Sequence, residues 1–115
     1  MALSVLALPA KEKSTYVVLC SFTDENGDPK VPDSMSYTLT DVEGNVINGK
    51  QNVAMTPLAE EMAIVLTGDD LAVFGAASVT RVVTVEGTYN SATYGNGLAL
   101  RDSIKITVDN LPGAL

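Results

Sequence analysis

The chain has 115 residues, of which 46 % are hydrophobic and 18 % are charged, and this length and composition are typical of one globular domain. It has no histidine and no tryptophan, which removes the usual general base near neutral pH and the commonest transition-metal ligand. The net charge of −7 argues against nucleic-acid binding because an acidic surface repels phosphate, and no apolar run reaches the about 18 residues that a membrane-spanning helix needs.

The N-terminal stretch MALSVLALPA is apolar but short, and no basic segment precedes it. We therefore expect an edge strand or an arm here, in particular over residues 3–8, and not a signal peptide. This divides the chain into an N-terminal arm or edge strand (1–14), one domain (15–111) and a tail (112–115).

Two strands joined by a turn follow the arm. Residues 15–23 (TYVVLCSFT) are apolar on both faces, which predicts a strand covered on both sides. The cluster DENGDPKVP at 24–32 predicts a turn, because Asn-Gly tolerates positive φ and proline stops a ladder. Residues 34–41 (SMSYTLTD) alternate between apolar and polar, which predicts a half-buried strand.

The middle of the chain contains shorter elements. Val42 to Asn45 predicts a tight turn, and residues 46–47 and 52–55 predict short strands. Residues 60–67 (EEMAIVLT) alternate with period two, which favours a strand over the rival helix that Glu, Met, Ala and Leu would also permit. Asp69 is expected to cap a single helical turn after this strand.

The stretch 81–90 (RVVTVEGTYN) is the longest uninterrupted run of strand-forming residues. Its apolar and polar faces predict the central strand of an antiparallel sheet with one face buried. A flexible loop is expected at 91–97, followed by a last strand at 98–109 with a bulge at Arg101-Asp102, where the polarity changes phase.

Together these elements predict an all-β chain, an antiparallel β-sandwich of about seven strands that is immunoglobulin-like in architecture. The Cys–Trp–Cys pattern of antibody domains is absent. The single cysteine, Cys20, excludes an internal disulfide, and its place on an inward face predicts a buried thiol that behaves as a small hydrophobic residue.

Several acidic residues have spacings that occur in binding sites. Asp24, Asn26 and Asp28 match the first three positions of a calcium loop, but Pro29 replaces its glycine and no glutamate closes it, so a plain turn explains them better. Asp69-Asp70, with Asp41 or Glu43 from another loop, would form an oxygen site if the loops met at one end of the sandwich.

Two further sets of residues are candidates for function. Glu86 and Asp102 would be the carboxylate pair of a glycosidase, although the chain lacks the tryptophans that stack on sugars. We expect no catalytic residue, cofactor or metal, and we predict an interaction patch formed by Leu3, Leu6, Leu8, Phe74 and Tyr94.

Three segments, SFTDENGDPKVPDSMSYTLTDVEGNVINGK, AIVLTGDDL and RVVTVEGTYNSATYGNGLALRDSIKITVDNL, resemble small immunoglobulin-like structural proteins of tailed phages and prophages. The resemblance extends from Thr15 to Leu111. It implies a non-enzymatic virion-associated module near the tail or the head–tail junction, located in the virion or in the host cytoplasm during assembly.

The expected partners are other virion or assembly proteins, with a homo-oligomer as a further expectation and with neither nucleic acid nor membrane. Residues 3–8 are the segment best suited to exchange between subunits, because an exposed edge offers unpaired backbone groups. The alternative function is a glycan- or cell-surface-binding immunoglobulin-like adhesion module, in which Tyr94 would contact the ligand.

Overall fold

The computed structural model of the chain describes residues 2–5, 10–11, 13–73 and 79–109. Over these residues the fold is all-β, as the sequence predicted, apart from the single 3-10 turn η1 (Gly68–Leu71). No helix in the described residues is long and apolar enough to cross a membrane. The strands are β1 (Ala2–Val5), β2 (Ala10–Lys11), β3 (Thr15–Ser21), β4 (Ser34–Thr40), β5 (Val53–Ala54), β6 (Glu61–Thr67), β7 (Val79–Ser91) and β8 (Gly95–Asp109).

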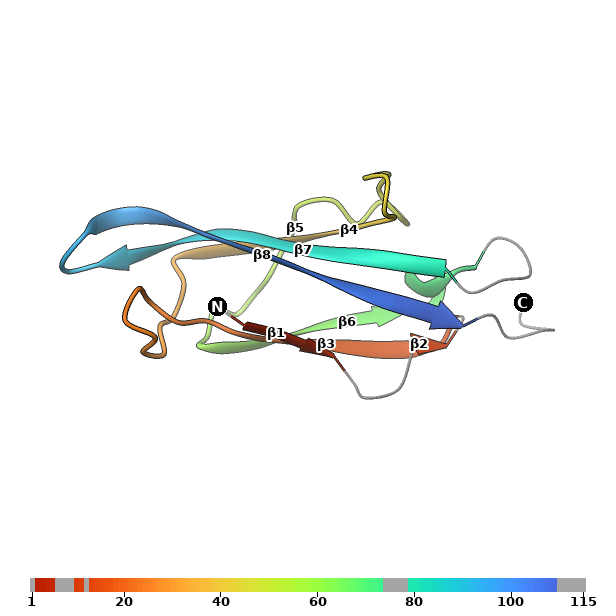
Figure 1. Cartoon of the computed structure of the whole chain (residues 1–115), viewed down its shortest axis with the longest axis horizontal. Coiled ribbons are helices and arrows are strands. Elements are labelled where there is room, and N and C mark those ends of the chain that lie inside the picture. The colour runs from red at the N-terminus through yellow and green to blue at the C-terminus, as the bar shows by residue number, and fades with distance from the viewer. Residues whose placement is uncertain (1, 6–9, 12, 74–78, 110–115) are drawn as a thin grey trace.

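The strands form two sheets that lie as two layers (Figure 1). The three-stranded sheet has the order β1-β3-β6, and the five-stranded sheet has the order β2-β8-β7-β4-β5. The second sheet is mixed, because β2 pairs with β8 in parallel, whereas the sequence predicted purely antiparallel pairing. The Lys11 ammonium and the Asp109 carboxylate, 2.9 Å apart, form an ion pair beside this parallel contact.

β7 is the central strand of the larger sheet, as predicted, and lies between β4 and β8. Val83 and Val85 are fully buried and Tyr89 is buried, whereas Glu86 on the other face is exposed. β-branched residues suit this half-buried pleated surface. β7 and β8 form a long hairpin whose tip extends beyond the other strands at one end of the molecule (Figure 1).

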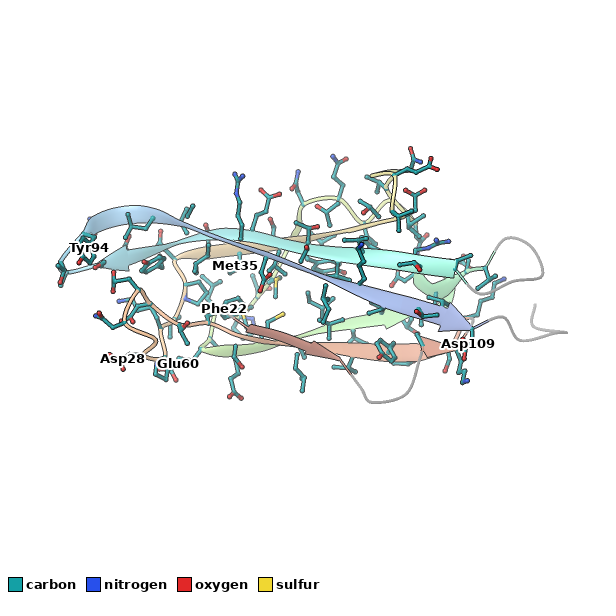
Figure 2. All side chains as sticks on the ribbon, viewed as in Figure 1. Phe22, Asp28, Met35, Glu60, Tyr94 and Asp109 are labelled. Carbon is teal, nitrogen blue, oxygen red and sulfur yellow. The ribbon has the colours of Figure 1, made fainter. Side chains whose placement is uncertain are left out.

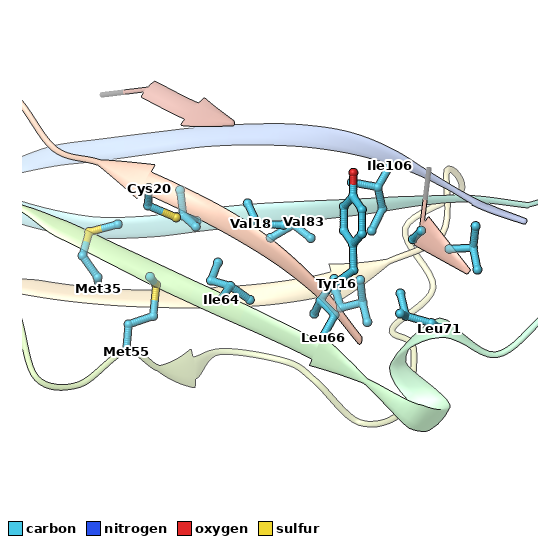
Figure 3. Packing of buried hydrophobic residues seen from close by; sticks show 14 of the residues in the cluster. Tyr16, Val18, Cys20, Met35, Met55, Ile64, Leu66, Leu71, Val83 and Ile106 are labelled. Carbon is cyan, nitrogen blue, oxygen red and sulfur yellow. The ribbon is translucent and has the colours of Figure 1, made fainter. Parts of the chain in front are cut away.

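The core lies between the two sheets (Figure 3). Val18, Ile64 and Leu66 from the three-stranded sheet face Val83 and other residues of the five-stranded sheet. Because these side chains are almost wholly removed from water, each contributes roughly 1.5–3 kcal/mol of hydrophobic free energy. The strand predicted at residues 60–67 is therefore confirmed as β6, with its even-numbered apolar residues turned into this core.

The bulge predicted at Arg101-Asp102 is absent from β8. The pairing of β8 with β7 runs without interruption from Leu98 to Val108, so Arg101 and Asp102 form no bulge. The side chain of Asp102 lies on the same inward face of β8 as those of Leu100 and Ile106. The polar residue at this position therefore does not mark a shift in the alternation of the two faces. The irregularity lies instead between Tyr89 and Ser91.

The flexible loop expected at 91–97 is a tight turn. β7 continues to Ser91 and β8 begins at Gly95. The Ser91 Oγ accepts hydrogen bonds from the backbone N–H groups of Thr93 and Tyr94, at 3.2 and 3.1 Å. A side chain therefore closes the turn, in the manner of the local serine turns that compete with extended backbone.

The helical turn η1 was predicted, but its N-cap is Thr67 and not Asp69. Asp70, and not Asp69, accepts a hydrogen bond from the backbone N–H of Thr67 at the start of the turn, at 3.1 Å. Asp70 also accepts one from the Asn48 side chain at 2.9 Å, and only 3 % of the residue is exposed. Two donors from the chain satisfy this buried carboxylate, as burial of a charge requires.

Gly87 allows β4 and β7 to approach closely. It lies opposite Met35 in the register of the two strands. A Cβ atom at this position would overlap the backbone carbonyl oxygen of Ser34 and the Sδ atom of Met35. The glycine that interrupts the apolar face of β7 is therefore needed for packing, as glycine in a strand often is where backbones come close.

We predict that Gly87→Ala destabilises the protein by roughly 1–3 kcal/mol or more, because the new methyl group overpacks the β4–β7 contact. Chemical denaturation of the two proteins measures this. Thr84→Ala, on the opposite face of the same strand, is the control and should cost less than about 1 kcal/mol. Equal stability of Gly87→Ala and the unchanged chain would contradict the close approach.

Candidate functional site

The outer face of the three-stranded sheet is apolar at its centre. In the register of β3 and β6, Val17 pairs with Val65 and Leu19 pairs with Ala63, and all four side chains point away from the core. Leu19 and Val65 are 51 % and 53 % exposed. We call Val17, Leu19, Ala63 and Val65 the apolar quartet.

Polar pairs border the apolar quartet along the strands. Thr15 pairs with Thr67 at one end, where their hydroxyl oxygens lie 3.2 Å apart, and Ser21 pairs with Glu61 at the other end. The sequence predicted that the strand at 15–23 is covered on both sides, and this is wrong for Leu19. The quartet was missed because apolar residues on both faces of a strand were taken to indicate a second covering layer.

The edge of β6 that faces away from β3 is free among the described residues. The N–H of Phe22 donates to the carbonyl of Glu60, and the N–H of Gly68 donates to the carbonyl of Ser14, so the even-numbered residues of β6 bond to β3. Because alternate residues of an antiparallel strand bond to opposite sides, the backbone groups of Glu61, Ala63 and Val65 point to the free edge.

A groove of about 390 Å³ runs beside this edge. One wall is β6, from Glu61 to Val65, and the other is the segment from Ala54 to Ala59 that connects the two sheets. Tyr37 and the half-buried Met62 also line the groove. The free edge, the groove and the apolar quartet therefore share one strand, β6.

The residues of the predicted interaction patch are not gathered at one place. Leu3 lies in β1, which pairs with β3 of the same chain. Tyr94 lies at the tip of the β7–β8 hairpin (Figure 2), where it is 67 % exposed. Leu6, Leu8 and Phe74 lie outside the described residues.

The residues with calcium-loop spacing form a turn. The Asp24 carboxylate accepts hydrogen bonds from the backbone N–H groups of Asn26 and Asp28, at 2.9 and 3.1 Å, and Gly27 has a φ of 82°. In the described ranges, no group of three or more acidic or cysteine side chains is placed to hold a metal ion. Turn chemistry accounts for the positions of Asp24 and Gly27.

The other acidic candidates are each held in a separate arrangement. Asp69 lies 3.9 Å from the Lys13 ammonium, and Asp41 closes its own turn. Asp102 lies opposite Val85 and Glu86 opposite Arg101 in adjacent positions of the ladder. Because side chains alternate across a strand, Glu86 and Asp102 lie on opposite faces of the sheet and cannot act together on one bond.

Cys20 is buried, as predicted, and burial together with the charge of Asp102 raises the pKa of its thiol to about 11. At neutral pH it is therefore a protonated thiol. A thiol in this state is a poor nucleophile, because the thiolate is the reactive form.

Sequence reasoning also missed Arg81, which is only 6 % exposed. Its guanidinium donates to the carbonyl of Ala72 at 3.3 Å and to the carbonyl of Thr80 at 3.1 Å, whereas its Nε has no partner. The Ala72 contact fastens the segment after η1 to the start of β7. Arg81 also lines a hollow with Asp41 and Glu43, and its charge contributes to lowering the pKa of Asp41.

No family model, no curated protein and no solved structure matches this chain.

Hydrogen bonds lower the pKa of Asp41, first of all the bond of 3.0 Å from the Asn45 side chain and then those from the backbone of Asn45 and Glu43. These hydrogen bonds stabilise the folded protein when the Asp41 carboxylate is ionised. Their stabilising effect is fully present above the unfolded-state pKa, about 3.9, and is lost as the pH falls through the lower folded-state pKa.

We predict that Asn45→Ala raises the pKa of Asp41 toward its ordinary value, because the largest of these hydrogen bonds is removed. An NMR titration of the side-chain carboxyl carbons measures this. Asn96→Ala, at an exposed asparagine of the β7–β8 hairpin, is the control and should leave the pKa of Asp41 unchanged. An unchanged value in Asn45→Ala would show that the side-chain bond does not form in solution.

Proposed function

We propose that the chain is a non-enzymatic structural module of a phage or prophage particle, built as an immunoglobulin-like β-sandwich and acting by protein–protein contact near the tail or the head–tail junction. The observation that carries the proposal is the exposed apolar quartet of Val17, Leu19, Ala63 and Val65. The resemblance of three segments to phage immunoglobulin-like proteins supports the particle as its setting.

The arrangement of the quartet favours contact with protein. Single exposed apolar residues are normal on protein surfaces, but here two cross-strand pairs adjoin on one face. Contiguous exposed apolar surface marks interaction sites, and an apolar centre with a polar rim is the usual anatomy of a protein–protein interface. Thr15, Thr67, Ser21 and Glu61 supply that rim.

The partners are accordingly other virion or assembly proteins, met in the host cytoplasm during assembly and retained in the virion. Particles purified on a density gradient from lysed host cells test this by quantitative mass spectrometry. The chain should co-purify with the major particle proteins at a fixed ratio. Its complete loss during purification would overturn the particle assignment.

We predict that Leu19→Lys reduces incorporation of the chain into particles several-fold, because a buried ammonium would replace an apolar contact. Its stability should change by less than about 0.5 kcal/mol, since Leu19 lies on the surface of the isolated chain. Thr107→Lys, at an exposed position of β8, adds the same charge elsewhere and should be incorporated normally. Equal incorporation of both variants would exclude the quartet as the contact.

A second candidate function is glycan or cell-surface binding, which Tyr94 favours because it is 67 % exposed at the hairpin tip (Figure 2). A tyrosine ring offers a partner a large apolar face together with a hydroxyl that can form a hydrogen bond. If this function holds, the chain binds a glycan array saturably and Tyr94→Ala weakens the binding at least several-fold, whereas Leu19→Lys leaves it unchanged. Absence of saturable binding would remove this candidate.

A further inference from the structure

We propose that two copies of the chain pair antiparallel through the free edges of β6, about a two-fold axis at Ile64, and so join their three-stranded sheets into one. This deepens the proposed function and rests on its premise that the chain acts through protein contact. It does not depend on the phage setting.

The backbone of β6 is arranged for such pairing. The N–H and C=O groups of Ala63 and Val65 point to the free edge, as derived from the bonds of the neighbouring residues to β3. With the axis at Ile64, Ala63 lies opposite Val65 of the partner subunit, and Val65 lies opposite Ala63 of the partner subunit. Since each such pair exchanges two backbone bonds, about four hydrogen bonds form.

The side chains of β6 complement themselves in this register. On the outer face a small residue, Ala63, meets the larger Val65 of the partner subunit, and the two apolar quartets become one continuous stripe. Glu61 meets the uncharged Thr67 of the partner subunit. Glu61 is the only charged residue of the strand, so no like charges are opposed.

The side chains also select this register over its neighbours. An axis at Val65 would place Ala63 opposite Thr67 of the partner subunit and would leave Glu61 without a strand residue opposite it, because β6 ends at Thr67. An axis at Ala63 would place Glu61 opposite Val65 of the partner subunit, leaving an apolar residue against a carboxylate. Only the axis at Ile64 gives both Ala63 and Val65 an apolar residue of the partner subunit as their pair.

A second copy is the occupant that these observations favour. Any extended peptide can bond to a free backbone edge, but the complementarity just described concerns the side chains of β6 itself. The ladder between the two copies also ends at Thr67, because the N–H of Thr67 is already bonded to Asp70 at 3.1 Å and does not bond to a partner strand. In this pairing, β6 of the partner subunit lies in the groove beside β6 in both copies.

The test is the dimer dissociation constant of the full chain, measured by sedimentation velocity over a range of concentrations. Thr67→Glu places a carboxylate opposite Glu61 of the partner subunit at both ends of the two-fold contact. We expect the dimer to weaken by about 2- to 30-fold, the combined effect of two such cross-strand pairs. Thr67→Lys creates two opposite-charge pairs and should strengthen the dimer by a similar factor.

These two variants are matched controls for each other. Thr67 is exposed, and both substitutions remove the same contact with the Thr15 hydroxyl. A loss of stability from that contact is therefore common to both variants, whereas their effects on the dimer dissociation constant are opposite. Thr107→Glu adds the same charge to the other sheet and should leave the dissociation constant unchanged. A chain that stays monomeric at every concentration overturns the proposal, as does a dimer that Thr67→Glu and Thr67→Lys affect alike.

Two combinations of results separate pairing through β6 from the assignment to a phage particle. A chain that is monomeric in solution but is found in particles at a fixed ratio refutes pairing through β6 and supports contact with another virion protein. A dimer with the expected response to both variants that is missing from particles supports the pairing and refutes the particle assignment.

Discussion

The pairing of β7 with β4 on one side and β8 on the other is the constraint on which the rest of the structure depends. Register against β7 places Leu39 opposite Val83 and brings Ile104 to the other side of the same residue. A slip of one residue would turn Val83 and Val85 to water, because side chains alternate along a strand. Gly87 fixes this register, since only a residue without Cβ fits against Ser34 and Met35.

The strands with one apolar face could be predicted from the sequence. β4 and β7 alternate cleanly, and their buried apolar residues are those that the alternation assigned to the core. β6 had a rival as a helix, which the period of two correctly excluded. Alternation succeeds in these cases because it reports directly which side of a strand faces the opposite layer.

The apolar quartet could not be predicted, because a sequence does not state how many layers a fold has. Leu19 and Val65 lie in strands that are apolar on both faces, a pattern also found in strands covered on two sides. Asp102 on β8 and Arg81 on β7 show the opposite case, in which polar residues hold inward positions. Arg81 is satisfied in part by the carbonyl of Ala72, a contact between segments that no local pattern encodes.

The edges of the two sheets differ in a way that bears on how the chain acts. The five-stranded sheet ends in β2 and β5, each two residues long, and very short edge strands are one means by which proteins prevent unwanted pairing. β6 is seven residues long, contains no proline and carries one charge, at its first residue. Such an edge invites aggregation unless something covers it.

The same strand supplies half of the exposed apolar quartet, so the risk from an open edge and the risk from an apolar surface fall on one element. An interface that covers β6 removes both risks at once, which is the physical reason to place the contact there and not at the short edges of the larger sheet.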